Sequence, residues 1–273
     1  MTFTRALIVS LALSFSAVTQ TATAASEKLD IPPVSQNTGV WCWLAVSEMA
    51  LRYHGVSNAN PAGYYQCGMA GLLYPATCGS QCGNCTFPAG SANTIVRALE
   101  AYPRAAQAFT GRSQPGIDAD HENTALSAEE VVDMIDAGVP IIAGISPSRT
   151  GLPASEHVAL IIGYRRDGEV LIVNDPFPFE AAGVRNPYLA AGARPLEGLQ
   201  YAIDRDTFED RLLWRETITV RQARSRARPD RHPNFCCTPF GRLGPYPNAT
   251  YTEGDACYGT DPYARTWTGR ACF

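Results

Sequence analysis

The chain contains 273 residues, of which 45% are hydrophobic and 18% are charged. A chain of this length buries a core of its own, so disorder is excluded as the default. With 22 Lys and Arg against 26 Asp and Glu, the net charge of −4 excludes a polycation built to bind nucleic acid.

The first 24 residues have the pattern of a secretory signal peptide. Arg5 precedes a 13-residue apolar stretch, residues 6–18, and Ala22-Thr23-Ala24 forms an A-x-A cleavage pattern. We therefore expect cleavage after Ala24 and a secreted protein, either periplasmic or extracellular. A buried N-terminal helix is the alternative. No run of 18 apolar residues is present, so we expect no membrane span in the mature protein.

Apolar residues at helical spacing predict three helices in the first half of the mature chain. Residues 42–53 carry one apolar face, and His54-Gly55 ends it. Residues 91–101 and 127–137 are shorter amphipathic segments, and Ser127 with Glu130 forms a capping box in the latter. The glycine- and cysteine-rich residues 64–90 are expected to be irregular.

After Gly138 the period changes to that of strands. Short apolar runs rich in β-branched residues cover residues 139–145, 157–164 and 169–174, and residues 199–203 and 215–220 are further candidates. Residues 165–168 (RRDG) are a hairpin turn signal between two of these strands. Because the chain runs from helices to strands, the fold class is predicted to be α+β.

The composition changes again at residue 221. Five arginines lie within residues 221–231, and the remaining chain holds four cysteines among Gly, Pro and Tyr. We divide the chain into a signal peptide (1–24), a main domain (25–220) and an Arg-rich linker with a small cysteine-rich tail (221–273). The linker is read as solvated, and the tail as a candidate for cell-surface contact.

Nine cysteines leave one unpaired if the other eight form four disulfides. The eight fall in two clusters of four, residues 67–85 and residues 236–272, and Cys42 stands apart. An oxidising compartment favours disulfides in both clusters, with a zinc site as the alternative for the first. Adjacent Cys236 and Cys237 are not expected to bridge each other. We expect no cofactor and no bound metal.

Cys42 begins its predicted helix, where the partial positive charge of the helix N-terminus favours a thiolate. A thiolate is the nucleophile of acyl-transfer chemistry. Gln36 lies six residues earlier, so its side-chain amide and the Cys42 backbone N–H are candidates for a two-donor oxyanion hole.

His157 is the candidate base for this thiolate. His54 lies at the far end of the same helix, His121 in a polar stretch read as a loop (DADHEN), and His232 in the tail. His157 opens an apolar strand, and the next strand ends at Asn174-Asp175-Pro176, so the hairpin places His157 beside Asn174 or Asp175. Such a neighbour would fix the tautomer and orientation of the ring.

With these motifs in place, the sequence resembles the papain-like cysteine peptidases. Gln36-x5-Cys42-Trp43 before a helix resembles their nucleophile segment, and Glu156-His157-Val158-Ala159 with Asn174-Asp175-Pro176 resembles their histidine and third-residue strands. The similarity is greatest to short bacterial secreted and effector members with a Cys-His-Asp triad. It covers roughly residues 31–220.

The resemblance implies a two-lobed fold, with a helical N-terminal lobe and an antiparallel β C-terminal lobe. It implies that Cys42 attacks an amide carbonyl, that His157 protonates the leaving amine, and that Asp175 orients His157, with Asn174 as the alternative third residue. Gln36 would stabilise the oxyanion, and Phe177 would shield the His157 bond from water.

The expected function is a secreted cysteine peptidase that acts on a protein or peptide substrate. Two alternatives stay open. One is a cell-wall peptide amidase or acyltransferase that uses the same triad, because only the pocket would differ. The other is a catalytically silent, disulfide-rich binding protein.

Overall fold

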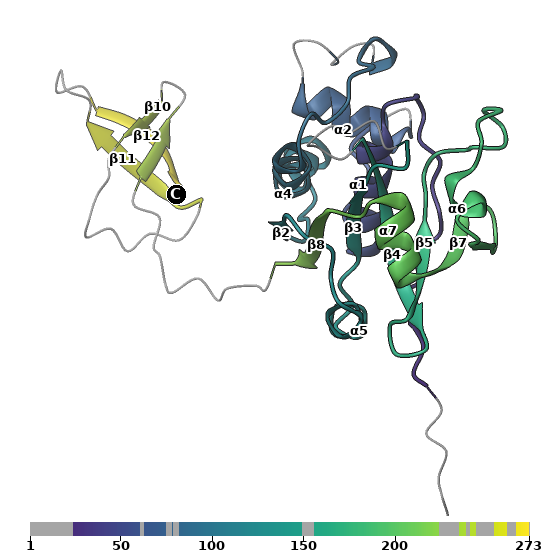
Figure 1. The fold of residues 1–273 in the computed structure, drawn as a ribbon. Coiled ribbons are helices and arrows are strands. Elements are labelled where there is room, and N and C mark those ends of the chain that lie inside the picture. Colours follow the sequence, from purple (N-terminus) through teal and green to yellow (C-terminus); the bar gives the residue numbers. More distant parts are fainter. Residues whose placement is uncertain are drawn as a thin grey trace, which may run out of the picture. The chain divides into compact units, whose positions relative to one another are not determined.

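A computed structural model describes residues 24–60, 63–74, 78, 82–148, 156–223, 235–238, 241–243, 254–260 and 266–272. The chain divides between Arg221 and Gln222 into two compact units (Figure 1). Residues 1–23 of the predicted signal peptide and the arginines at positions 224, 226, 228 and 231 lie outside the described residues.

A large antiparallel sheet forms the centre of the first unit. Within the described residues its strands are β1 (Glu27–Lys28), β2 (Ile117–Glu122), β3 (Ile141–Ile145), β4 (His157–Arg165), β5 (Val170–Asn174), β6 (Arg194–Pro195), β7 (Gln200–Asp204) and β8 (Glu216–Gln222). Their order is β2-β8-β3-β4-β5-β7-β6, and β1 pairs with β4. The pairs β3–β4, β4–β5 and β5–β7 are antiparallel.

The strands predicted from the β-branched runs are confirmed. Every residue of β3 and β5 is buried, and β4 is buried except at its two ends. Burial on both faces explains why these strands read as continuous apolar runs rather than as an alternation.

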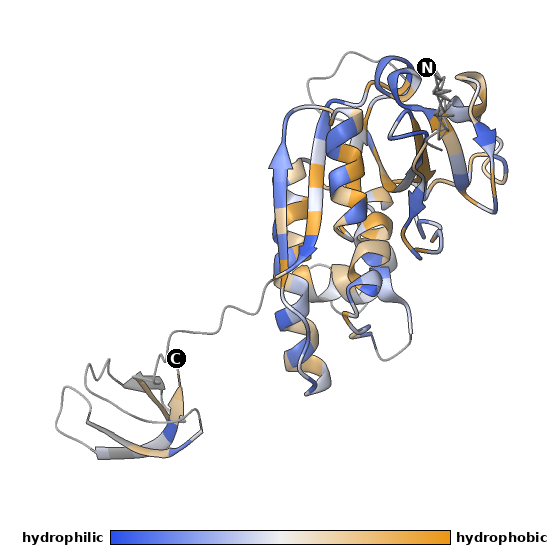
Figure 2. Cartoon of the chain, turned by 90° about the horizontal axis from the view of Figure 1, so that it is seen from below, coloured by the Kyte–Doolittle hydropathy of each residue, from blue (hydrophilic) through white to orange (hydrophobic). Residues whose placement is uncertain are grey.

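Most helices of this unit come before β3 in the sequence. They are α1 (Cys42–Tyr53), α2 (Tyr65–Leu73), the 3-10 turn η1 (Cys82–Asn84), α4 (Ala92–Thr110) and α5 (Ala128–Asp136), followed by the short α6 (Pro187–Ala190) and α7 (Arg205–Leu212). Hydrophobic and hydrophilic residues both occur along the helices (Figure 2), and in α4 and α5 the buried residues recur at helical spacing. The bounds of α1 agree with the prediction, and most of its side chains are buried.

Three sequence-based expectations are wrong in this unit. Residues 65–73 form a helix instead of an irregular segment. His121 lies on β2 rather than in a loop, because Ile117 and Ala119 alternate with exposed neighbours as in a half-buried strand. The helix at residue 92 continues to Thr110 through Pro103, since Tyr102 and Ala106 extend its buried face.

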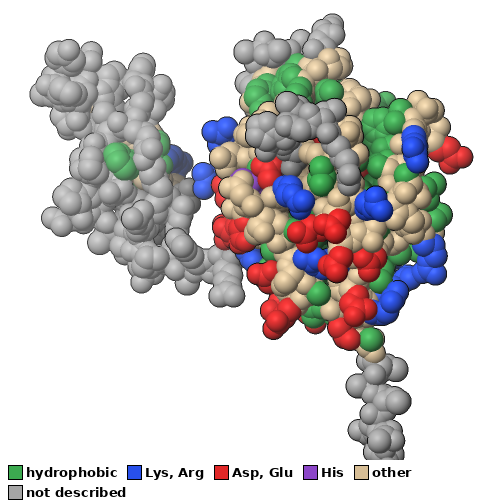
Figure 3. Space-filling model, in the orientation of Figure 1, with side chains coloured by type: hydrophobic (Ala, Val, Ile, Leu, Met, Phe, Trp, Pro, Cys, Tyr) green, Lys and Arg blue, Asp and Glu red, His purple; other side chains and the backbone are tan. Residues whose placement is uncertain are grey.

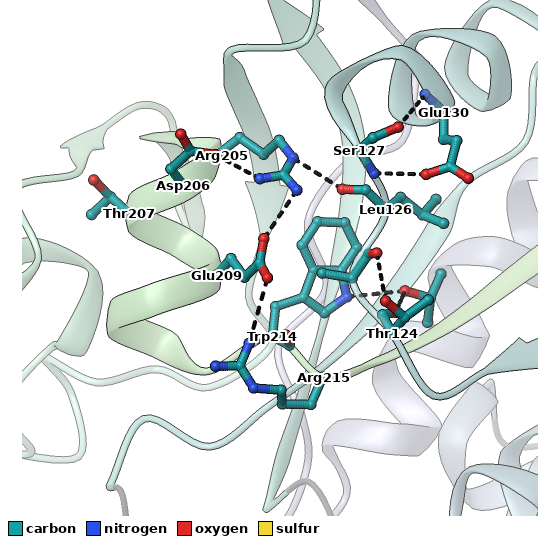
Figure 4. A network of polar contacts seen from close by, with 12 residues as sticks. Thr124, Leu126, Ser127, Glu130, Arg205, Asp206, Thr207, Glu209, Trp214 and Arg215 are labelled. Carbon is teal, nitrogen blue, oxygen red and sulfur yellow. Dashed lines mark hydrogen bonds and ion pairs between the residues drawn. The ribbon is translucent and has the colours of Figure 1, made fainter.

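The predicted capping box of α5 is confirmed. The Glu130 backbone N–H donates to the Ser127 hydroxyl at 3.2 Å, and the Ser127 N–H donates to the Glu130 carboxylate at 2.7 Å. Figure 4 shows how the segment before this helix is held. Arg205 on α7 donates to the Leu126 carbonyl at 2.9 Å, and Thr217 on β8 donates to the Thr124 carbonyl at 2.6 Å.

The second unit is a small antiparallel sheet. Its described strands are β9 (Phe235–Thr238), β10 (Gly241–Leu243), β11 (Ala256–Thr260) and β12 (Thr266–Cys272), in the order β10-β9-β12-β11. Disulfides Cys236–Cys257 and Cys237–Cys272 cross it.

The cysteine arithmetic is confirmed. Cys67–Cys82 and Cys78–Cys85 are disulfides, so the first cluster holds no zinc thiolates. Among the described residues Cys42 is the free cysteine. No helix in the described part of the chain is long and apolar enough to cross a membrane.

Charged side chains of both signs are spread over the face of the first unit shown in Figure 3. Acidic groups gather on its lower part in this view, with basic groups among and around them.

The turn between β4 and β5 requires glycine at position 168. Arg166, Asp167 and Gly168 all have positive φ, and a Cβ on Gly168 would collide with the backbone oxygen of Ala128. Gly183 also has a positive φ, of 65°, but its Cβ would meet open space.

We therefore expect Gly168→Ala to lower the free energy of unfolding by more than about 2 kcal/mol, because strain and collision add. Gly183→Ala, which has only the strained backbone, is the matched control and should cost about 1 kcal/mol. Urea denaturation measures both values, and equal losses would contradict the collision.

Candidate active site

His157 and Asp175 meet at one end of the β4–β5 hairpin. His157 begins β4, and Asp175 follows the last residue of β5. The ring Nε2 lies 2.9 Å from Asp175 Oδ1 and 3.0 Å from Oδ2. The Phe177 backbone N–H donates to the same Oδ1 at 2.8 Å, so the carboxylate is oriented from two sides.

Asn174 points away from this pair. Its amide donates to the Ile31 carbonyl at 2.9 Å, and its oxygen accepts from the Gln200 amide at 2.9 Å. Successive residues of an extended chain face opposite sides of the sheet. The structure therefore brings Asp175, and not Asn174, to His157.

Cys42 is the first residue of α1 and lines the same pocket as His157. The proximity of the Cys42 side chain contributes to raising the pKa of the His157 ring. Because Nε2 is engaged by Asp175, Nδ1 is the nitrogen left for the sulfur. The backbone N–H of the first residue of a helix has no acceptor within that helix. The Cys42 N–H is therefore available to an acceptor beyond the N-terminal end of α1.

The environment of His157 favours the protonated ring. Burial lowers its pKa, but the attraction and hydrogen bond of Asp175, with a smaller contribution from Cys42, raise the pKa of His157 to about 10 overall. An imidazolium that stays protonated at neutral pH favours ionisation of a neighbouring thiol, which gives a thiolate–imidazolium ion pair.

Gln36 lies on the segment that leads into α1. Its side chain is buried, with 7% exposed, and its amide nitrogen donates to the Thr38 carbonyl at 2.7 Å. The same carbonyl accepts the Trp41 N–H, so this amide sits beside the start of the helix. An amide nitrogen carries two hydrogens, which leaves one for another acceptor.

Aromatic rings enclose the His157–Asp175 pair. Phe177 and Phe179 present their ring planes nearly perpendicular to the imidazole, at centroid distances of 6.4 and 6.5 Å. The fully buried Tyr188 stands near the carboxylate, and burial together with Asp175 raises the pKa of its hydroxyl well above 10. Sequence reasoning named Phe177 but missed Phe179 and Tyr188, because no local pattern links them to residue 157.

The other described histidines lie elsewhere. His54, at the end of α1, contacts the Val220 carbonyl at 3.0 Å, and burial lowers its pKa. His121 on β2 lies 3.6 Å from Glu216. His232 falls outside the described residues.

A pocket of about 230 Å³ opens beside Cys42 and His157. Its lining is mostly apolar: Trp43, Pro88, Ala89, Ala92, Ile95, Ile142, Val158 and Ile218. Glu156 and Glu216 also line it. An apolar hollow beside a thiol–imidazole pair suits a side chain of a bound peptide. Among the described residues, no cluster of His, Cys, Asp and Glu has the arrangement of a metal site.

Comparisons with known proteins identify a peptidase family. The profile of the Peptidase_C39 like family matches residues 28–201. A solved C39-like peptidase from Bacillus anthracis is 14% identical, with a TM-score of 0.40 over 72% of this chain and 98% of that one. A double glycine motif protease from an AMS/PCAT transporter, solved with its leader peptide, is 14% identical, with a TM-score of 0.38 over 74% and 96%. No curated protein matches the chain.

The His157 titration tests the role of the carboxylate. We expect NMR to find the ring protonated through neutral pH, with a pKa of about 10. Asp175→Asn should lower that pKa, because burial then acts without the opposing charge. Since the folded-state pKa lies above the ordinary 6.5, this pair stabilises the fold fully below 6.5, and the contribution is lost as the pH rises through about 10.

Asn174→Ala is the matched control, because the Asn174 side chain bonds Ile31 and Gln200 and not His157. It should leave the His157 titration in place while lowering stability. A similar pKa change in both variants would contradict a specific effect of Asp175.

Proposed function

The chain belongs to the Peptidase_C39 like family of cysteine peptidases, and we propose that it hydrolyses peptide bonds through a Cys42–His157–Asp175 triad. The observation that carries the proposal is the His157 ring, which is bonded through Nε2 to Asp175 and lines the same pocket as Cys42, whose side chain contributes to raising the pKa of the ring. The resemblance noted in the sequence to the papain-like enzymes adds to this reading.

The first step forms a bond between the Cys42 sulfur and the carbonyl carbon of the peptide. His157, already protonated, then gives its proton to the leaving amine, and the C–N bond breaks to leave a thioester. Water, deprotonated by the now neutral His157, attacks the thioester and releases the acid. Asp175 holds the ring in one orientation throughout, as the third member of a triad does.

The oxyanion of each tetrahedral intermediate is assigned to two donors. They are the Cys42 backbone N–H, at the positive end of α1, and the second amide hydrogen of Gln36. The Gln36 backbone N–H donates to the Pro176 carbonyl at 2.9 Å. This bond supports the assignment, because it ties the donor's segment to the residue that follows Asp175.

We propose that the peptidase domain spans residues 25–220 and that the protein is secreted. Four disulfides support an oxidising compartment, and the apolar N-terminal stretch supports export. The cysteine-rich tail remains a candidate for cell-surface contact.

Alkylation tests the nucleophile. We expect iodoacetamide to label Cys42 alone in the unreduced protein, and to do so below pH 7, because the imidazolium stabilises the thiolate. Mass spectrometry of peptides locates the label. A Cys42→Ala variant should lose hydrolysis of casein and of mixed peptides, and Ser47→Ala, a buried polar change on the same helix, is the control. Activity that survives in Cys42→Ala would rule out the triad.

Processing gives a separate test of export. The Ala25 backbone nitrogen lies 2.7 Å from the Asp167 carboxylate, and the Asp167 N–H donates back to the Ala25 carbonyl at 3.1 Å. Cleavage after Ala24 would turn that nitrogen into an ammonium group facing a carboxylate. We expect the intact mass of the secreted protein to begin at Ala25. Asp167→Asn should cost at most about 1 kcal/mol, because the pair is exposed.

A further inference from the structure

The disulfide-bonded segment of residues 65–87, of which the structure describes 65–74, 78 and 82–87, makes hydrogen bonds to the residues that flank Cys42 and to those that flank Gln36. We call it the stapled segment. It contains α2 and η1, and its two bridges are Cys67–Cys82 and Cys78–Cys85. The bridges join residues 15 and 7 positions apart, so each holds the two cysteines that it joins close together.

The residues on either side of Cys42 are tied to this segment. The Trp41 indole N–H donates to the Cys85 carbonyl at 2.7 Å, and the Trp43 indole N–H donates to the Phe87 carbonyl at 3.4 Å. Both indoles are buried, with 2% and 1% of each residue exposed. A buried indole N–H needs an acceptor, so these bonds specify where the segment lies against the start of α1.

The residues on either side of Gln36 are tied to the same segment. The side chain of Gln66, on α2, donates to the Ser35 carbonyl at 3.0 Å and accepts the Asn37 N–H at 3.0 Å. Its amide also donates to Glu48 of α1 at 3.0 Å. Gln66 is 1% exposed, and it sits next to Cys67 of the first bridge. One buried side chain thus connects α2, α1 and the Gln36 segment.

We propose that the stapled segment positions the Cys42 thiol and the Gln36 amide, with Trp41 and Gln66 as positioning residues. The inference rests on the proposed function. It implies a redox requirement, because hydrolysis needs Cys42 as a thiol and the two bridges as disulfides. A mild reductant that keeps Cys42 as a thiol should therefore restore activity. A dithiol reductant strong enough to reduce the Cys78–Cys85 bridge to two thiols, itself becoming a disulfide, should lower it.

The decisive experiment removes one bridge without a reductant. We expect the full chain with Cys78→Ser and Cys85→Ser to lose at least about tenfold in kcat, since small displacements of a nucleophile cost that much. The rate of Cys42 alkylation as a function of pH should change as well, which loss of stability alone would not produce. Cys236→Ser with Cys257→Ser removes a bridge from the second unit and should keep kcat within about twofold.

A second pair of variants covers the case in which the bridge variant does not fold. Trp41→Phe removes the indole donor, and Trp214→Phe removes a buried indole donor that bonds Glu216 and Thr217 instead. We expect only Trp41→Phe to lower kcat, by about tenfold, at temperatures where both remain folded. Wild-type kcat in Trp41→Phe and in the folded bridge variant would overturn the positioning role. That result would leave the triad intact, provided that Cys42→Ala is inactive.

Discussion

The buried carboxylate of Asp175 is the group on which the site depends. Its side chain is 0% exposed, and an isolated charge in such a place is strongly unfavourable. The His157 ring and the Phe177 N–H supply the compensating contacts. Removal of one partner from a buried pair is costly, so the two residues fix each other, and the His157 ring is held in the pocket that Cys42 also lines.

Contacts across the chain hold the helical and the sheet parts of the site in register. Asn174, one residue before the buried carboxylate, bonds the Ile31 carbonyl, and the Gln36 N–H bonds the carbonyl of Pro176, one residue after it. The segment that delivers Cys42 is therefore anchored on both sides of Asp175. The proposed chemistry needs a sulfur and an imidazole close together, and a few hydrogen bonds between loops, next to rigid elements, would hold them there.

Local patterns made part of this arrangement predictable. Helix α1 and the β4–β5 hairpin follow from apolar periodicity and from the RRDG turn, and the hairpin placed His157 next to residues 174 and 175. Helix α2 was missed because Gly68 and Gly71 lower its helix propensity, while its stability comes from distant contacts such as Gln66 with Glu48. Strand β2 was missed because four of its six residues are charged or histidine. Spacing alone does not decide whether Asn174 or Asp175 contacts His157, because that depends on side-chain contacts with residues distant in the sequence, such as Ile31.

The disulfides divide in the same way as the chain. Two join residues before position 86, two join residues after position 235, and none of the four connects the units. A single backbone cut between Gln222 and Phe235 would accordingly leave no covalent link between the two units, and each fragment would keep its own two cross-links without any reductive step.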